Sequence, residues 1–395
     1  MYMKTNFTYF MPTEIIFGPG TLGKLATVKL PGKKALLVIG SGNSMRRHGY
    51  LDRVVNYLKQ NGVDYVVYDK ILPNPIAEHV AEGAKVAKDN GCDFVIGLGG
   101  GSTIDSSKAI AVMAKNPGDY WDYVSGGSGK GMEVKNGALP IVAIPTTAGT
   151  GTESDPWAVV TKTETNEKIG FGCKYTYPTL SIVDPELMVS IPPKFTAYQG
   201  MDAFFHSVEG YLATVNQPGS DVLALQSISL ITENLPKAVA DGNNMEARTA
   251  LAWASTAAGI VESLSSCISH HSLEHALSAY HPEIPHGAGL IMLSVSYFSF
   301  MASKAPERFV DIAKAMGEEI VGNTVEEQAM CFINGLKKLI RNIGMEDLSL
   351  SSFGVTEDEA TKLAKNAMDT MGGLFNVDPY KLSLDEVVSI YKNCF

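Results

Sequence analysis

Histidine side chains are concentrated in one short stretch of this chain. The segment "HHSLEHALSAYHPEIPHG", residues 270–287, holds five of the eight histidines in a sequence of 395 residues. Imidazole nitrogens bind divalent first-row metal ions, and the ring titrates near neutral pH. A single histidine is more often structural, but a cluster of this density predicts a metal site or a proton-transfer site.

A second motif supplies the carboxylate for such a site. "GMDAFFHSVEGY" sets Asp202 and His206 four residues apart, so on a helix both side chains leave one face, one turn apart. His271 and His275 repeat that spacing, and His286 follows a turn that contains proline. One carboxylate with two or three imidazoles from different helices predicts a site for a divalent ion with room for a substrate oxygen.

The elements before these motifs alternate between strand and helix. Short apolar runs predict strands at 35–40, 64–69 and 93–99, and amphipathic patterns predict helices at 50–62 and 77–91. Two further apolar runs, "PIVAIPTT" and "TLSIVDP", continue the strands to about residue 184. Because parallel strands need a crossover connection and are covered on both faces, this alternation predicts a parallel sheet.

Glycine-rich turns follow two of the expected strands. Gly99, Gly100 and Gly101 precede a helix that begins near Ser102, and "GSGNS" begins at Gly40. Glycine allows a tight turn, and the N–H groups at a helix N-terminus favour a phosphate. Neither turn has the GxGxxG fingerprint, and each alone is compatible with a turn that binds nothing. Two such turns at the carboxyl edge of one parallel sheet indicate a nucleotide site.

A third segment, "PTTAGTGTESD", follows the strand near residue 144. It is compatible with a flexible loop. Alternatively, the hydroxyls of Thr146, Thr147 and Thr150 donate to phosphate or carboxamide oxygens of a bound nucleotide.

The composition excludes several classes of protein. The chain is 45% hydrophobic and 19% charged, with a net charge of −10 and no run of lysine or arginine, so nucleic acid is not an expected partner. Five scattered cysteines without a CxxC pair indicate reduced thiols in the cytoplasm. No stretch of eighteen apolar residues predicts a membrane span.

After Pro192-Pro193 the pattern of apolar and polar residues becomes almost wholly helical. We therefore expect an α/β dinucleotide-binding domain with a parallel sheet at 1–190 and an all-α domain for metal and substrate at 191–395. The active site is expected in the cleft between them.

Six motifs together resemble the iron-containing (group III) alcohol dehydrogenases, in particular the NADP(H)-using branch of butanol dehydrogenases and aldehyde reductases. The similarity covers essentially the whole chain in the right order. The motifs are "GGGSTIDSSKA", "PTTAGTGTE", "KIGFGCKYTYPTLSIVDPEL", "GMDAFFHSVEGY", "HSLEHALSAYHPEIPHG" and "LSLDEVVSIYKNCF".

The resemblance implies roles for individual residues. It places His275 near the nicotinamide, as the candidate catalytic residue. The implied metal ligands are Asp202, His206, His271 and His286. The implied cofactor contacts are Asn74, Gly99, Gly100, Gly101, Ser102, Asp105, Thr146, Thr147, Thr150 and Lys168, with Lys108 in register after Asp105. Iron as Fe²⁺ is the expected ion, and Zn²⁺ and Mn²⁺ are the alternatives.

The histidine spacing departs from the family pattern. His286 follows His275 by eleven positions, one more than in much of the family, and His281 lies between them. His281 is therefore an alternative ligand or a substrate-pocket residue.

The turn after the first strand also departs from the pattern. Many members of the family carry an aspartate where this chain has Gly40, and that carboxylate accepts a hydrogen bond from the adenosine ribose. Without it a 2′-phosphate fits, which predicts a preference for NADP(H) over NAD(H). The expected binding residues are Gly40, Ser41, Gly42, Asn43 and Arg46.

The expected reaction is reversible hydride transfer between NADP(H) and a primary alcohol/aldehyde pair, with His275 as a candidate proton relay. A glycerol-dehydrogenase-like or dehydroquinate-synthase-like enzyme of the same fold, or a non-catalytic assembly protein, is the alternative. The alternating segment "FTYFMPTEIIFG" predicts a strand with an exposed edge, and hence a homodimer or a larger homo-oligomer.

Overall fold

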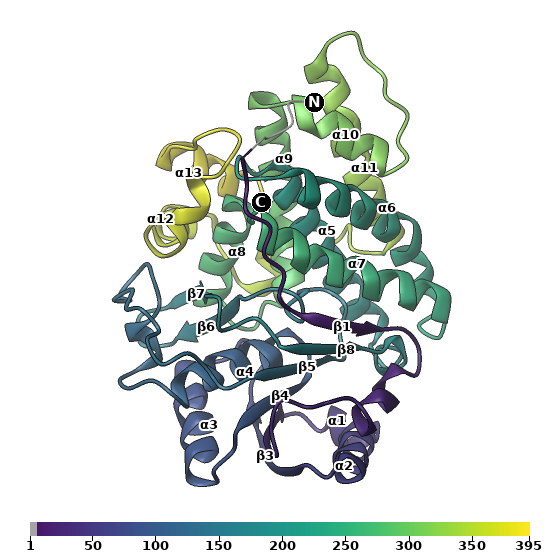
Figure 1. The fold of residues 1–395 in the computed structure, drawn as a ribbon. Helices are drawn as coiled ribbons and strands as arrows, with labels where there is room; N and C mark the ends of the chain where they lie inside the picture. The colour runs from purple at the N-terminus through teal and green to yellow at the C-terminus, as the bar shows by residue number, and fades with distance from the viewer. Residues whose placement is uncertain (1–5) are drawn as a thin grey trace. The chain divides into compact units, whose positions relative to one another are not determined.

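The computed structural model describes residues 6–395, which form two compact units (Figure 1). One unit comprises residues 11–191. The other comprises residues 192–395 together with residues 6–10.

A six-stranded sheet is the centre of the 11–191 unit. Its order is β1-β8-β5-β4-β2-β3, and every pairing in it is parallel. This confirms the predicted α/β fold with a parallel sheet. The strands are β1 (Glu14–Phe17), β2 (Lys34–Gly40), β3 (Asp64–Ile71), β4 (Phe94–Gly99), β5 (Ile141–Pro145) and β8 (Leu180–Val183).

Helices connect these strands and bury their apolar faces on the sheet. In the second helix, Val54 and Leu58 are fully buried in a core that also contains Leu37 and Ile96 of the sheet. Gly62 ends that helix with a φ of 73°, a left-handed conformation that glycine adopts without strain. The helices are α1 (Ser44–Arg47), α2 (Tyr50–Asn61), α3 (Ala77–Asp89) and α4 (Gly101–Met113).

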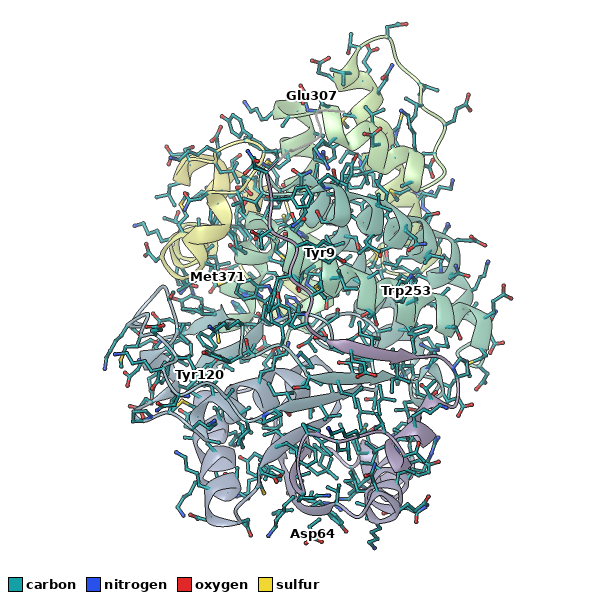
Figure 2. All side chains as sticks on the ribbon, in the orientation of Figure 1. Tyr9, Asp64, Tyr120, Trp253, Glu307 and Met371 are labelled. Atoms are coloured by element: carbon teal, nitrogen blue, oxygen red, sulfur yellow. The ribbon has the colours of Figure 1, made fainter. Side chains whose placement is uncertain are left out.

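A separate antiparallel hairpin, β6 (Ala158–Lys162) with β7 (Glu167–Phe171), completes this unit. Tyr120, labelled in Figure 2, is buried and meets the ring of Phe171 edge-on at a centroid distance of 5.7 Å. This contact packs the hairpin onto the segment that follows α4.

The strand expected across residues 7–18 forms only in part. β1 has four residues, and each pairs with one residue of β8. Among the described residues before it, Thr8 accepts a hydrogen bond at its carbonyl from Gln217 Nε2, and Tyr9, labelled in Figure 2, lies against Gly219. These contacts hold residues 8 and 9 on the helical unit instead of in a strand.

The helical unit is built on long, mostly buried helices, and α5, α6 and α7 lie side by side in it (Figure 1). Phe205 stacks on Phe298, and Phe298 meets Phe332 edge-on, so the core is aromatic. This confirms the predicted helical region after the sheet. The helices are α5 (Pro193–Leu212), α6 (Pro218–Ala240), α7 (Met245–Leu264), α8 (Ser269–Tyr280), α9 (His286–Lys304), α10 (Glu307–Ala315), α11 (Val325–Asn342), α12 (Ala360–Phe375) and α13 (Leu384–Lys392).

No single helix among residues 6–395 combines the length and apolar composition of a membrane span. The pair α7 and α8 passes by length and composition only when joined across a bend of 107°. All five cysteines are free thiols.

Candidate active site

Helix α5 carries the predicted carboxylate and the first predicted histidine. Asp202 and His206 lie one turn apart on it, as their spacing predicts, and both are buried. Glu209 follows one turn later and is fully buried. A single helix therefore directs three polar groups into an apolar interior, and each of them needs a partner there.

Helices α8 and α9 bring the other histidines to α5. His271 and His275 are buried on α8, and His286 is the first residue of α9. Gly287 explains the close approach of α9, because a Cβ atom there would lie 2.2 Å from the carbonyl oxygen of Tyr198 on α5. Only glycine allows this contact, which sets His286 beside Asp202.

Three imidazole nitrogens converge on one carboxylate oxygen. Asp202 Oδ1 lies 3.5 Å from His206 Nε2, 3.6 Å from His271 Nε2 and 3.5 Å from His286 Nε2. These distances exceed a hydrogen bond, but they match ligands of one ion, since tetrahedral donors bonded at about 2.1 Å lie about 3.4 Å apart. Asp202 Oδ1 and His271 Nε2 are buried without a hydrogen-bond partner in the described structure. Asp202, His271 and His286 therefore offer donor atoms close enough for one divalent ion, and His206 Nε2 faces the same carboxylate oxygen.

Buried carboxylates orient two of these rings. His271 Nδ1 donates to Glu209 Oε1 at 2.6 Å, and His286 Nδ1 donates to Glu274 Oε2. A proton held on Nδ1 leaves the lone pair on Nε2, the nitrogen that faces Asp202. Both rings thus present the tautomer that a metal ion requires.

His206 has a different environment. Its Nε2 lies 2.7 Å from Glu262 Oε1 as well as 3.5 Å from Asp202 Oδ1, and its Nδ1 is buried without a hydrogen-bond partner in the described structure. The thiol of Cys267 donates to the same Glu262 oxygen at 3.2 Å. The His206 side of the site therefore carries a second carboxylate and a sulfur.

The charges in the site are strongly coupled. Burial alone would raise the pKa of Asp202, but the nearby His206, His286 and His271 outweigh burial and hold that pKa below its usual value. Burial also disfavours a charged His271, but Cys267 and Glu209 outweigh it and raise the pKa of His271 well above the ordinary value. This pocket stabilises positive charge beside an anionic Asp202, and a bound divalent ion would supply that charge in place of the proton on His271.

His275 and His281 lie in different surroundings. The ring of His275 is buried beside His286, with a centroid distance of 5.4 Å, so His275 is next to the proposed ligands. His281 Nε2 instead lies 3.1 Å from Glu359 Oε2, and its Nδ1 lies 3.6 Å from Glu283 Oε1. Among the described residues, His281 belongs to none of the clusters that could hold an ion.

The predicted nucleotide turns all lie at one edge of the sheet. The turns at 40–43, 99–102 and 146–150 follow β2, β4 and β5, which are neighbours in the sheet. A Cβ atom on Gly100 would lie 3.0 Å from Thr147, and one on Gly101 would lie 2.4 Å from Thr150. The glycines therefore let the second and third turns pack on each other at the carboxyl edge, where parallel sheets bind nucleotides.

Asp105 and Lys108, two residues that the family resemblance places in the cofactor region, form hydrogen bonds below this edge of the sheet. Asp105 accepts hydrogen bonds from Thr152 Oγ1 at 2.6 Å and from the Val159 backbone at 3.0 Å. Lys108 is fully buried and donates to Thr152 and to Asp155. These bonds hold the 146–155 segment in place, and direct contact of Asp105 with a cofactor stays a prediction.

Three further predicted contacts have definite positions in the same unit. Asn74 follows β3 in a left-handed conformation with a φ of 53°, and Lys168 is buried on β7. Arg46 lies on α1, where its Nη2 atom is 2.7 Å from Asp69 Oδ2. The sequence motifs gave no signal that Asp69 would pair with Arg46.

Sequence reasoning missed the carboxylates that surround the histidines. Glu209 was detectable, because it lies three residues after His206 and seven after Asp202, on the same face of a helix. Glu262 and Glu274 carry no comparable local signal. Their roles depend on how α7, α8 and α9 meet.

Comparisons with known proteins find similar chains along nearly the whole sequence. Residues 12–185 match the family described as iron-containing alcohol dehydrogenase, and residues 196–395 match the Fe-containing alcohol dehydrogenase family, C-terminal. The chain is 34% identical to an NAD-dependent methanol dehydrogenase of Bacillus methanolicus over 98% of this chain and 99% of that protein. It is also 34% identical to an NADPH-dependent butanol dehydrogenase of Clostridium saccharobutylicum over 97% of each.

A solved structure extends the likeness to the whole fold. An archaeal halo-thermophilic alcohol dehydrogenase from a Red Sea brine pool superposes with a TM-score of 0.95 and 35% identity, covering 100% of both chains.

Proposed function

The chain belongs to the iron-containing alcohol dehydrogenases, and we propose that it transfers a hydride between NADP(H) and a primary alcohol/aldehyde pair. The family implies a small-molecule alcohol or aldehyde substrate, a nicotinamide cofactor and a divalent metal, usually iron. The observation that carries the proposal is the convergence of three Nε2 atoms on Asp202 Oδ1 at 3.5–3.6 Å.

In this proposal Asp202, His206, His271 and His286 hold one divalent ion, Fe²⁺. When bound, the ion acts as a Lewis acid on the substrate oxygen, and the nicotinamide carries the hydride. Glu209 and Glu274 keep their histidines in the ligating tautomer, because each accepts the Nδ1 proton. His275, buried beside His286, is the candidate group for moving the alcohol proton.

The cofactor preference rests on charge at the end of β2. Gly40 offers no carboxylate to repel a 2′-phosphate, and the guanidinium of Arg46 is half exposed on α1. Family membership alone does not decide the cofactor, since relatives of equal identity are named for NAD and for NADPH. The proposal of NADP(H) therefore depends on Gly40 and Arg46, and it favours aldehyde reduction in a cell that keeps NADP reduced.

We also propose a cytoplasmic homodimer or larger homo-oligomer. Strand β1 is the edge strand of the described sheet next to β8, and an exposed strand edge tends to find a partner. Light scattering at micromolar concentration tests the assembly, and a monomeric mass contradicts it. Five free thiols fit a reducing compartment.

The reaction is tested by following absorbance at the NADPH band with butanal and the iron-loaded protein. Loss of NADPH that requires both butanal and metal supports the proposal. A metal-loaded protein that oxidises no NADPH with butanal and reduces no NADP⁺ with butanol overturns it.

A further inference from the structure

Cys267 lies at the metal site although no family ligand position falls on it. It stands in the short segment between α7 and α8, four residues before His271 and five after Glu262. Its thiol donates to Glu262 Oε1, the oxygen that also lies 2.7 Å from His206 Nε2. The Cys267 sulfur and the Glu262 carboxylate therefore lie on the side of the site that His206 forms.

The donor atoms on this face have the spacing of a ligand set. One donor atom each from His206, Cys267 and His271 lie within 4.8 Å of one another, as do one each from Asp202, His271 and His286. Donors of one ion bonded at about 2.1 Å for nitrogen and 2.3 Å for sulfur lie about 3.4–4.4 Å apart. The two sets share His271, which connects the Cys267 side of the site to Asp202 and His286.

Unpartnered nitrogens point to a ligand on this face. His206 Nδ1 and His271 Nε2 are buried and have no hydrogen-bond partner in the described structure. The two rings lie parallel, with centroids 4.5 Å apart and planes 17° apart. An ion bound by His271 Nε2 and the Cys267 sulfur would satisfy a buried nitrogen that otherwise stays unpaired at a cost.

We propose that Cys267 is an additional ligand of the metal centre and binds the ion through its thiolate. The thiol loses its proton as the sulfur–metal bond forms, and that proton is released to solvent. A thiolate is a soft ligand, so this side of the centre favours Zn²⁺ and Co²⁺ over Mn²⁺. The inference rests on the metal centre proposed above, and it adds a determinant of which ion that centre selects.

Cobalt substitution tests the proposal, because a cysteine thiolate bound to Co²⁺ produces a charge-transfer band in the near-ultraviolet. The full-length protein is loaded with Co²⁺, its cobalt content is measured by elemental analysis and its spectrum is recorded. Cys267→Ser and Cys267→Ala are compared with Cys331→Ser, which alters a buried cysteine on α11 away from the site. We expect the band in the wild type and in Cys331→Ser, and its loss in both Cys267 variants.

The outcomes separate this inference from the metal centre itself. Cobalt bound to the wild type without the near-ultraviolet band overturns the thiolate ligand and leaves the other four ligands standing. A wild type that binds no cobalt overturns both. If the Cys267 variants fail to fold, alkylation of the wild type decides instead. Bound Zn²⁺ is then expected to slow labelling of Cys267 by iodoacetamide at least severalfold, and an equal rate with and without Zn²⁺ contradicts the proposal.

Discussion

Arg46 and Asp69 form an ion pair beside the turn that follows β2. Arg46 Nη2 lies 2.7 Å from Asp69 Oδ2, and both side chains are about half exposed. Asp69 belongs to β3, the neighbour of β2 in the sheet. The guanidinium expected to meet a 2′-phosphate is therefore already paired with a carboxylate, which lowers the gain from phosphate binding.

Removing that carboxylate is expected to strengthen NADPH binding. Asp69→Asn frees Arg46 and removes a negative charge near the phosphate, so KM for NADPH should fall severalfold while KM for NADH changes little. Asp89→Asn, in the exposed pair with Lys85, is a matched control that should leave both values unchanged. A KM for NADPH that is unchanged or higher in Asp69→Asn would show that Arg46 does not meet the phosphate.

A carboxylate placed at Gly40 is expected to have the opposite effect. A Cβ atom there would meet the Ile71 carbonyl at 3.6 Å and Thr103 Oγ1 at 3.8 Å, which are ordinary contacts, so the backbone accepts a side chain. Gly40→Asp should lower kcat/KM for NADPH by roughly ten- to a hundredfold. This range corresponds to the free energy of a charged hydrogen bond, about 1.5–3 kcal/mol. Gly40→Asn adds nearly the same volume without charge and should change the ratio of the two cofactors far less. Equal losses in the two variants would assign the effect to volume.

Glu274 is expected to raise metal affinity through His286. Glu274→Gln weakens acceptance of the Nδ1 proton, and loss of such a carboxylate partner typically costs about 10–100-fold in metal affinity. Competition with a chelator for Zn²⁺ measures this directly. Glu283→Gln, an exposed change next to His281, is the control. An unchanged zinc affinity in Glu274→Gln would show that Glu274 does not support metal binding.

A buried acid in the helical unit makes stability depend on pH. Burial raises the pKa of Asp378 to about 7, although its hydrogen bond from the Ser269 backbone favours the charged form. The folded state therefore holds this proton to higher pH than the unfolded state, so the free energy of unfolding falls as pH rises from about 4 to about 7. Each unit of the shift contributes about 1.4 kcal/mol.

Asp378→Asn should remove this part of the pH dependence, because an amide keeps the shape of the neutral acid. Urea unfolding at pH 5 and pH 8 measures it. The difference in unfolding free energy between the two pH values should shrink in the variant. The same difference in both proteins would exclude Asp378 as its source.

The regular elements were predictable because their signals are local. Apolar runs and glycine turns marked β2, β3 and β4, and the spacing of Asp202 and His206 placed both on one face of α5. The strand expected across 7–18 was wrong for most of its length, because alternation does not reveal tertiary contacts such as those of Thr8 with Gln217 and Tyr9 with Gly219.

The rest of the site depends on contacts between distant segments. Arg46 and Asp69 meet only because β2 and β3 are neighbours, and Glu262 reaches His206 only because α7 packs on α5. His281 shared the histidine-rich stretch with the proposed ligands, but it lies after the end of α8 and faces Glu359. Spacing along the chain alone did not separate it from His286.

The metal content of His271→Ala tests the central claim most directly. His271 belongs to both ligand sets, whereas His281 lies outside them, so His281→Ala is the matched control. Elemental analysis of the purified proteins should find about one divalent ion per chain in the wild type and in His281→Ala. In His271→Ala, with a circular dichroism spectrum like that of the wild type, metal content should fall close to zero together with the rate of NADPH oxidation by butanal. Full metal occupancy and an unchanged rate in His271→Ala would contradict the account.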